Sequence, residues 1–390
     1  MKHFDIVDFI EQTFSPSENE TLLFMVDDSD PKRNERVEEW ARAMQKAGKL
    51  RVLPVLHHKQ TGRNGANLPP TGTQNGQKVS IADILKAADI VWSLPRYSAT
   101  RPLFQLKDKL EFRVGSSPNF QIPMLDSVMR ESPLDIQARG KILLPKVRLA
   151  DGLLIEFATG HHVYFDIRNV PWEEDLGNIT KGMGMALGNI PFGEICAPQH
   201  EGSLFSYLLQ KDRESDARDL ADFYKKYKFN GSNGKSLLRR DGTIIETETH
   251  GYIPISRNKD FWIYRIENGF VREIIGDGKT AAEQRKLLKK ELFWGYIAEV
   301  AFGLNSRADK NSPYTLENEK SAIHFAIGNS AQAGGFSTPF QHKAVEHHQD
   351  YTLTSPVVAE AKLIYNHKSI VPSETIITNG KYTIFGKLNF

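Results

Sequence analysis

The sequence predicts an α/β protein, in which a parallel, Rossmann-like α/β domain is followed by a mixed α+β domain. The first third alternates short apolar strand patterns with helical patterns, which is typical of a parallel sheet with crossover helices. The remainder carries alternating strand patterns around two helical stretches. At 390 residues the chain is also longer than one typical core, which favours two domains.

The elements of the first domain follow one another in a regular order. Residues 21–26 (TLLFMV) form a buried-strand pattern that ends in Asp27-Asp28-Ser29-Asp30-Pro31, a helix-start signal. Residues 34–47 then have helical spacing. We expect a strand at 51–56, a surface loop at 62–76, a helix at 81–88 and a strand at 89–94. No glycine-rich phosphate motif follows any of these strands, so the residues do not support a nucleotide cofactor.

The pattern changes near residues 139–145, so the predicted domains are 1–145 and 146–390. In the second domain we expect strands at 153–159, 162–167, 261–266, 361–365 and 382–385. Residues 203–228 and 280–300 have helical spacing. The first of these is strongly charged, and we expect a charged helical insertion near 203–256.

The composition excludes several classes of function and of site. Lys plus Arg is 50 against 48 Asp plus Glu, so no basic field would attract nucleic acid or acidic membranes. No segment reaches the ~18 apolar residues of a membrane span, and the first residues lack a signal-peptide pattern. Cys196 is the single cysteine, which excludes an internal disulfide and a thiolate zinc site. We therefore expect a cytoplasmic protein in which imidazole and carboxylate groups hold any metal.

Candidate metal ligands gather late in the sequence. His324, His342, His347 and His348 lie within twenty-five positions, and His348-Gln349-Asp350 is the most informative short string. In an extended strand, residues two apart point to the same side, so His348 and Asp350 could hold one ion. Taken alone, the string also fits an ordinary polar strand face.

Three more candidates lie in unusual surroundings. His324 and Glu299 are each embedded in an apolar run, SAIHFAIG and IAEVAFG, where an ionisable group needs a partner or a metal. A hydrogen-bonded core histidine is the alternative interpretation of His324. Glu194 follows Pro191 and Gly193 in an irregular segment of the kind that often carries sites.

The order of these strings resembles the thermophilic-metalloprotease (aminopeptidase T) family, with its leucyl-aminopeptidase-like and hydroxypyridine-dioxygenase-like relatives. The strings are NIPFGEI, AEVAFGLN, ENEKSAIHFAIG, Gly334-Gly335 and HQD, preceded by VRLADGLLIEFATGHHVYFDI. The resemblance covers most of the chain. Its motifs are less specific in the N-terminal third.

The resemblance implies a metalloaminopeptidase-like hydrolase that removes N-terminal residues from short peptides. The implied ligands of two divalent ions (Zn, Co or Mn) are Glu194, Glu299, His324, His348 and Asp350. Glu299 would bridge the ions, and Glu319, five residues before the motif histidine, would assist proton transfer. The family resemblance also implies a homodimer.

The same resemblance leaves a second reaction open. His324, His348 and Asp350 form a two-histidine, one-carboxylate set, which suits the single Fe(II) of a ring-cleaving hydroxypyridine dioxygenase. The presence of both Glu194 and Glu299 favours the dinuclear hydrolase. The peptidase members, however, have a tyrosine shortly after the motif histidine, and this chain has none between Gly328 and Tyr351. A non-catalytic binding protein of the same fold is the third alternative.

Overall fold

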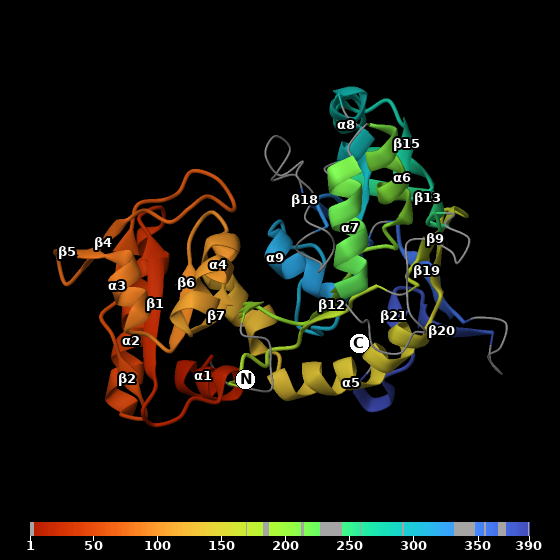
Figure 1. Cartoon of the computed structure of the whole chain (residues 1–390). Helices are drawn as coiled ribbons and strands as arrows, with labels where there is room; N and C mark the ends of the chain where they lie inside the picture. The colour runs from red at the N-terminus through yellow and green to blue at the C-terminus, as the bar shows by residue number, and fades with distance from the viewer. Residues whose placement is uncertain are drawn as a thin grey trace. The chain divides into compact units, whose positions relative to one another are not determined.

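The structure is a computed structural model of the whole chain (Figure 1). It describes all residues except 1–3, 169, 182–186, 212–213, 227–243, 258, 291, 331–347, 355, 366–371 and 389. The chain divides into two compact units, and each takes up several segments. The first comprises Met1–Gln137, Asp175–Glu194 and Leu304–Ser321, and the second comprises Ala138–Glu174, Ile195–Gly303 and Ala322–Phe390.

The first unit is built on a mostly parallel sheet with the strand order β11-β7-β6-β1-β3-β4-β5, and β2 pairs with β1. Its strands are β1 (Thr21–Asp27), β2 (Arg51–Val52), β3 (Leu56–His58), β4 (Thr71–Gln74), β5 (Gln77–Ser80), β6 (Ile90–Leu94), β7 (Arg113–Ser116) and β11 (Leu187–Asn189). Its helices are α1 (Ile6–Phe14), α2 (Pro31–Ala47), α3 (Ile81–Lys86), α4 (Thr100–Leu110) and the short α9 (Thr315–Asn318). This arrangement confirms the predicted α/β class.

The centre of this sheet follows from the sequence pattern. Every residue of β1 and β6 is buried, as expected of parallel strands that are covered on both faces. The turn after β1 starts α2, because the Asp30 carboxylate accepts hydrogen bonds from the backbone N–H groups of Lys32 and Arg33. The helix ends at Gly48, whose φ of +66° is the left-handed conformation that favours glycine.

The second unit contains an antiparallel sheet of order β15-β14-β13-β9-β8-β19-β20-β21. These strands are β8 (Gly152–Phe157), β9 (His162–Asp166), β13 (His250–Arg257), β14 (Asp260–Glu267), β15 (Phe270–Ile275), β19 (Val358–Ile364), β20 (Ser373–Thr378) and β21 (Lys381–Tyr382). The helices α6 (Gly202–Gln210), α7 (Glu214–Lys226) and α8 (Lys279–Lys290) belong to this unit. Helix α5 (Pro133–Leu149) contains the position at which the chain first passes from one unit to the other.

A further sheet has the order β10-β12-β16-β17-β18. Its strands are β10 (Glu173–Asp175), β12 (Glu194–Ala197), β16 (Ile297–Gly303), β17 (Ile323–Gly328) and β18 (His348–Thr352). The last three strands are antiparallel neighbours within the second unit, and all residues of β16 and β17 are buried. The predicted ligand motifs lie on these strands.

Several predicted elements need correction. The predicted strand at 51–56 is divided into β2 and β3, and Pro54 between them lacks the backbone N–H that a continuous ladder requires. The predicted helix at 280–300 ends earlier, because residues 297–303 form β16. A strand that is apolar on both faces cannot be told from a buried helical segment by periodicity. The stretch 71–74 in the predicted surface loop forms β4.

Among the described residues, no helix combines the length and the apolar character that a membrane span requires.

A buried arginine stabilises the first unit. The Arg113 guanidinium donates to both carboxylate oxygens of Glu20, at 2.8 and 2.7 Å, and to the carbonyl of Ile179 at 2.8 Å. Removing one partner of a buried ion pair leaves an uncompensated charge, which costs about 3–5 kcal/mol. We therefore expect Arg113→Met to lower the free energy of unfolding by about 3 kcal/mol in urea denaturation.

Arg36→Met is the matched control, because Arg36 pairs with Glu39 on an exposed part of α2. We expect that control to lower the free energy of unfolding by less than about 1 kcal/mol. Equal effects of the two substitutions would contradict the stabilising role of the Arg113–Glu20 pair.

Candidate metal centre

Three neighbouring strands of the second unit carry four of the five predicted ligands. Glu299 lies on β16, His324 on β17, and His348 and Asp350 on β18. Ala326 on β17 pairs with Glu299 on one side and with Asp350 on the other. His324 and His348 lie two residues along their strands from these paired positions. All four side chains therefore leave the sheet on the same face.

The four side chains form a compact group, which we call the histidine–carboxylate cluster. Glu299 lies between the two imidazoles: its Oε1 is 3.4 Å from His324 Nε2, and its Oε2 is 3.2 Å from His348 Nε2. The same His348 nitrogen is 3.1 Å from Asp350 Oδ1. The side chains of His324 and Glu299 are 1% and 7% exposed, whereas Asp350 is 18% exposed, so the cluster is most accessible at Asp350.

Both imidazoles are oriented by the backbone. His348 Nδ1 donates to the carbonyl oxygen of Asn329 at 2.8 Å, and His324 Nδ1 contacts the carbonyl oxygen of Ala322 at 3.4 Å. A carbonyl oxygen only accepts hydrogen bonds, so His348 Nδ1 carries a proton in its 2.8 Å bond to Asn329. Each Nε2 is then directed at the carboxylates. Metal-binding histidines commonly have this arrangement, in which a backbone carbonyl fixes the nitrogen that does not face the ion.

The charges in the cluster shift two pKa values in opposite directions. Burial raises the pKa of Glu299, but the hydrogen bonds and charges of His324 and His348 outweigh burial, and the net pKa lies below its ordinary value. Burial lowers the pKa of His348, but the Asp350 and Glu299 carboxylates outweigh it, and the net pKa lies well above its ordinary value. The cluster is therefore strongly polar although it is buried.

The geometry fits a divalent metal ion. Ligand atoms that lie ~2.1 Å from one ion, at tetrahedral or octahedral angles, are roughly 3.0–3.4 Å apart. The nitrogen–oxygen distances within the cluster are 3.1 to 3.4 Å. One ligand atom each of Glu299, His348 and Asp350 can be chosen so that all three lie within 4.8 Å of one another. Imidazole with carboxylate is also the ligand chemistry that Zn, Mn and Fe(II) accept.

Glu194 and Glu319 belong to the first unit, where they surround a buried lysine. Lys320 Nζ is 2.5 Å from Glu194 Oε1, 3.2 Å from Glu319 Oε1 and 3.5 Å from Asp175 Oδ2. Burial lowers the pKa of Lys320, but the three carboxylates outweigh burial and hold it well above its ordinary value. Burial raises the pKa of the Asp175 carboxyl to about 7. Lys320 lies in the motif ENEKSAIHFAIG. The spacing of residues in that motif does not indicate that three carboxylates would surround the lysine.

The ligand and catalytic assignments stay predictions. The structure brings Glu299, His324, His348 and Asp350 together on one sheet face, and it places Glu194 and Glu319 beside Lys320. His342, His347 and Gly334-Gly335 lie outside the described residues. Sequence reasoning missed Asp175 and the fully buried Glu201, since neither belongs to a recognisable motif.

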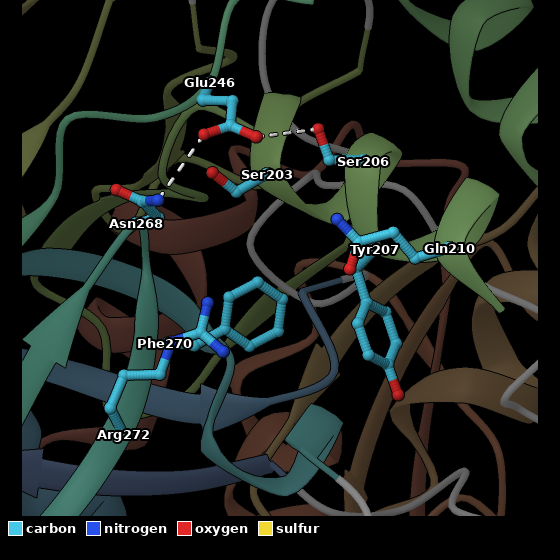
Figure 2. A pocket seen from close by; sticks show the side chains of 8 residues that line it. All are labelled: Ser203, Ser206, Tyr207, Gln210, Glu246, Asn268, Phe270 and Arg272. Carbon is cyan, nitrogen blue, oxygen red and sulfur yellow. Dashed lines mark hydrogen bonds between the residues drawn. The ribbon is translucent and has the colours of Figure 1, made fainter.

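A separate small pocket of the second unit contains none of the predicted ligands. One side of the pocket is formed by α6, and the other side by Glu246, by Asn268 after β14 and by the first residues of β15. Figure 2 shows the side chains that line it. Glu246 accepts hydrogen bonds from Ser206 Oγ at 3.0 Å and from Asn268 Nδ2 at 3.4 Å, and both are drawn in Figure 2. Glu246 and Asn268 are exposed, so we assign no function to this pocket.

Comparison with known proteins finds similarity at the level of the fold. No family model and no curated protein matches the sequence. A 2,5-dihydroxypyridine dioxygenase from Pseudomonas putida KT2440 is similar in structure, with 14% identity, a TM-score of 0.61 and 98% coverage of both chains. AmpT from Thermus thermophilus is also similar, with 11% identity, a TM-score of 0.54 and coverage of 97% of this chain and 98% of its own. The chain shares their α/β fold.

The pKa shifts predict how the stability of the metal-free protein depends on pH. A carboxylate whose pKa is lowered by folding adds stability above its unfolded pKa, 4.5 for glutamate, and this stability is lost as pH falls toward the folded pKa. We expect Glu299→Gln, in the presence of a chelator, to lower the free energy of unfolding by about 1–3 kcal/mol at pH 7. Below about pH 4.5 this difference should shrink.

Urea denaturation at several pH values measures this effect. Glu273→Gln is the control, because Glu273 is exposed on β15 and pairs with Arg265. A Glu299→Gln effect that is the same at pH 7 and at pH 4 would show that the carboxylate charge does not stabilise the cluster.

Proposed function

We propose that this protein is a metal-dependent hydrolase of the aminopeptidase type. The observation that carries the proposal is the orientation of His324 and His348. Both direct Nε2 at the Glu299 carboxylate and hold Nδ1 near a backbone carbonyl. An ordinary core histidine needs only one hydrogen-bond partner for each ring nitrogen, whereas a metal ligand needs an unprotonated nitrogen directed at other ligands.

The residues of the cluster have distinct roles in this proposal. The residues of the cluster would hold divalent metal, which would supply an activated water near neutral pH and polarise the carbonyl of the scissile bond. Glu299 turns its two oxygens toward different histidines, the arrangement that a bridging carboxylate requires. Asp350 completes the ligand set at the more exposed side of the cluster. Glu194 is proposed as a further ligand, and Glu319 as the group that moves a proton, on the motif order alone.

The family resemblance also supports proposals about the substrate, the oligomeric state and the cellular compartment. The substrate is a short peptide or another small molecule, the protein is a homodimer, and it acts in the cytoplasm. The near-neutral balance of 50 basic and 48 acidic residues agrees with the absence of a nucleic-acid or membrane partner.

A second function is favoured by a specific set of residues. His324, His348 and Asp350 form a two-histidine, one-carboxylate set on two adjacent strands, which suits Fe(II) with open positions for oxygen. The dioxygenase named above is one of the proteins that share the fold. In this function, oxygen-dependent ring cleavage of a hydroxypyridine would replace peptide hydrolysis.

Elemental analysis of gently purified protein tests the metal site. We expect divalent metal in the wild-type chain, and we expect Glu299→Ala to lose metal and activity together because it removes the carboxylate between both histidines. Glu273→Ala serves as the control on an exposed part of the same unit. An unchanged metal content in Glu299→Ala would contradict the proposed role of Glu299.

Metal identity and oxygen dependence separate the two functions. Two Zn, Co or Mn ions per chain, with cleavage of aminoacyl substrates under anaerobic conditions, would support the hydrolase. One iron per chain, with oxygen-dependent turnover of dihydroxypyridines, would establish the dioxygenase instead. A wild-type chain that binds no metal would contradict both functions.

A further inference from the structure

We propose that Glu201 and Ser330 are positioning residues for His348, and that they act through the backbone carbonyl of Asn329. This inference rests on the proposed metal site, because it concerns the nitrogen that His348 offers to the ion. All of these residues belong to the second unit. None of Glu201, Ser330 and Asn329 belongs to the predicted ligand set.

The first step is the hydrogen bond that orients the His348 ring. His348 is the first residue of β18, and its Nδ1 donates to Asn329 O at 2.8 Å. This bond keeps the proton on Nδ1 and directs Nε2 at Glu299 and Asp350. If the Asn329 carbonyl moved, the ring would be free to rotate or to change tautomer. The geometry of a ligand at this position therefore depends on Asn329.

The second step is the position of Asn329 itself. Asn329 follows Gly328, the last residue of β17, whose φ of +111° is a backbone conformation that favours glycine. The Gly328 N–H donates to the carbonyl of Tyr296 at 2.8 Å. On the other side of Asn329, Ser330 Oγ donates to Glu201 Oε1 at 2.8 Å. The Asn329 carbonyl, which accepts the hydrogen bond from His348 Nδ1, thus lies between two residues that are held in place.

The third step is the rigidity of Glu201. Its side chain is fully buried, and the segment that carries it is attached on both sides. Gln199 Nε2 donates to the carbonyl of Gly269 at 2.9 Å, and the His200 N–H donates to the carbonyl of Asp166 at 3.1 Å. Glu201 is therefore held in place by its own segment, and its hydrogen bond with Ser330 at 2.8 Å restrains the residue after Asn329.

The burial of Glu201 is itself informative. A carboxylate that is removed from water costs several kcal/mol unless other interactions compensate. A merely structural link between α6 and the segment after β17 could be made by an apolar contact or a neutral amide at lower cost. Glu201 is connected to His348, a predicted metal ligand, through Ser330 and the Asn329 carbonyl. Buried groups that contact a ligand indirectly in this way commonly orient the ligands of metal sites.

Zinc affinity of the full-length chain, measured by competition with a chromogenic chelator, tests the proposal. Outer groups of this kind typically change metal affinity by 10- to 100-fold, so we expect Ser330→Ala and Glu201→Ala each to weaken Zn²⁺ binding by about tenfold or more. The double variant should be no weaker than the single ones, because both substitutions break the same link. Glu201→Gln keeps an acceptor for Ser330 and should recover most of the affinity.

Ser206→Ala is the matched control. It removes a serine–glutamate hydrogen bond of similar length, Ser206 Oγ to Glu246 Oε1 at 3.0 Å, from the pocket in Figure 2. We expect its zinc affinity to stay within about twofold of the wild type, since the side-chain hydrogen bonds of Glu246 among the described residues go to Ser206 and Asn268 and not to His348. Equal losses in Ser206→Ala and Ser330→Ala would overturn the proposal, because they would reflect general destabilisation.

A second measurement does not depend on the metal. Exchange of the His348 Nδ1 proton with water, followed by nitrogen-15 NMR in a chelator, reports the bond to Asn329 directly. We expect exchange to be about fivefold faster in Ser330→Ala and Glu201→Ala than in the wild type and in Ser206→Ala. Unchanged exchange would overturn the positioning role. A wild type that binds no zinc but shows the expected exchange pattern would contradict the proposed function and leave this role supported.

Discussion

The candidate site depends on the register of three antiparallel strands. Because side chains alternate between the two faces of a sheet, a shift of one residue in β18 would move both His348 and Asp350 to the other face. The observed register pairs Ala326 with Glu299 and with Asp350, and it places the four side chains of the cluster on one face. All residues of β16 and β17 are buried. A slip of one residue would therefore move Glu299 or His324 to the opposite buried face, which carries Val300 and Phe325.

Burying the ionisable side chains of the cluster costs free energy of solvation, and their mutual interactions have to compensate this cost. Four ionisable side chains with little exposure are brought within hydrogen-bonding distance, and the charges of acids and imidazoles compensate one another. The first unit contains a second buried group of this kind, in which the positive charge of Lys320 is compensated by Glu194, Glu319 and Asp175. Two such groups in one chain exceed what stability requires, since apolar side chains of similar volume would fill the same space at lower cost.

The fold is compatible with more than one chemistry, and the site decides between them. The dihydroxypyridine dioxygenase and AmpT share this α/β architecture at 14% and 11% identity to this chain, so the fold by itself selects no reaction. In the two proposed functions, the number of ions that the histidine–carboxylate cluster would hold is the physical variable that separates hydrolysis from oxygen chemistry. The contacts of Glu299, whose oxygens face different histidines, make it the residue on which this number depends.

The sequence by itself determined the α/β class and the strands β1, β6 and β14, and it indicated the candidate ligands, because local periodicity and ordered motifs encode them. Only the tertiary structure decided which ligands meet, since strand register depends on contacts far apart in the chain. It also moved Glu299 from a predicted helix to β16, because a strand buried on both faces has no distinctive period. Glu201 and Asp175 carry no local signal in the sequence. Glu194 and Glu319 lie in recognisable motifs, but only the tertiary structure shows that they meet Asp175 around Lys320.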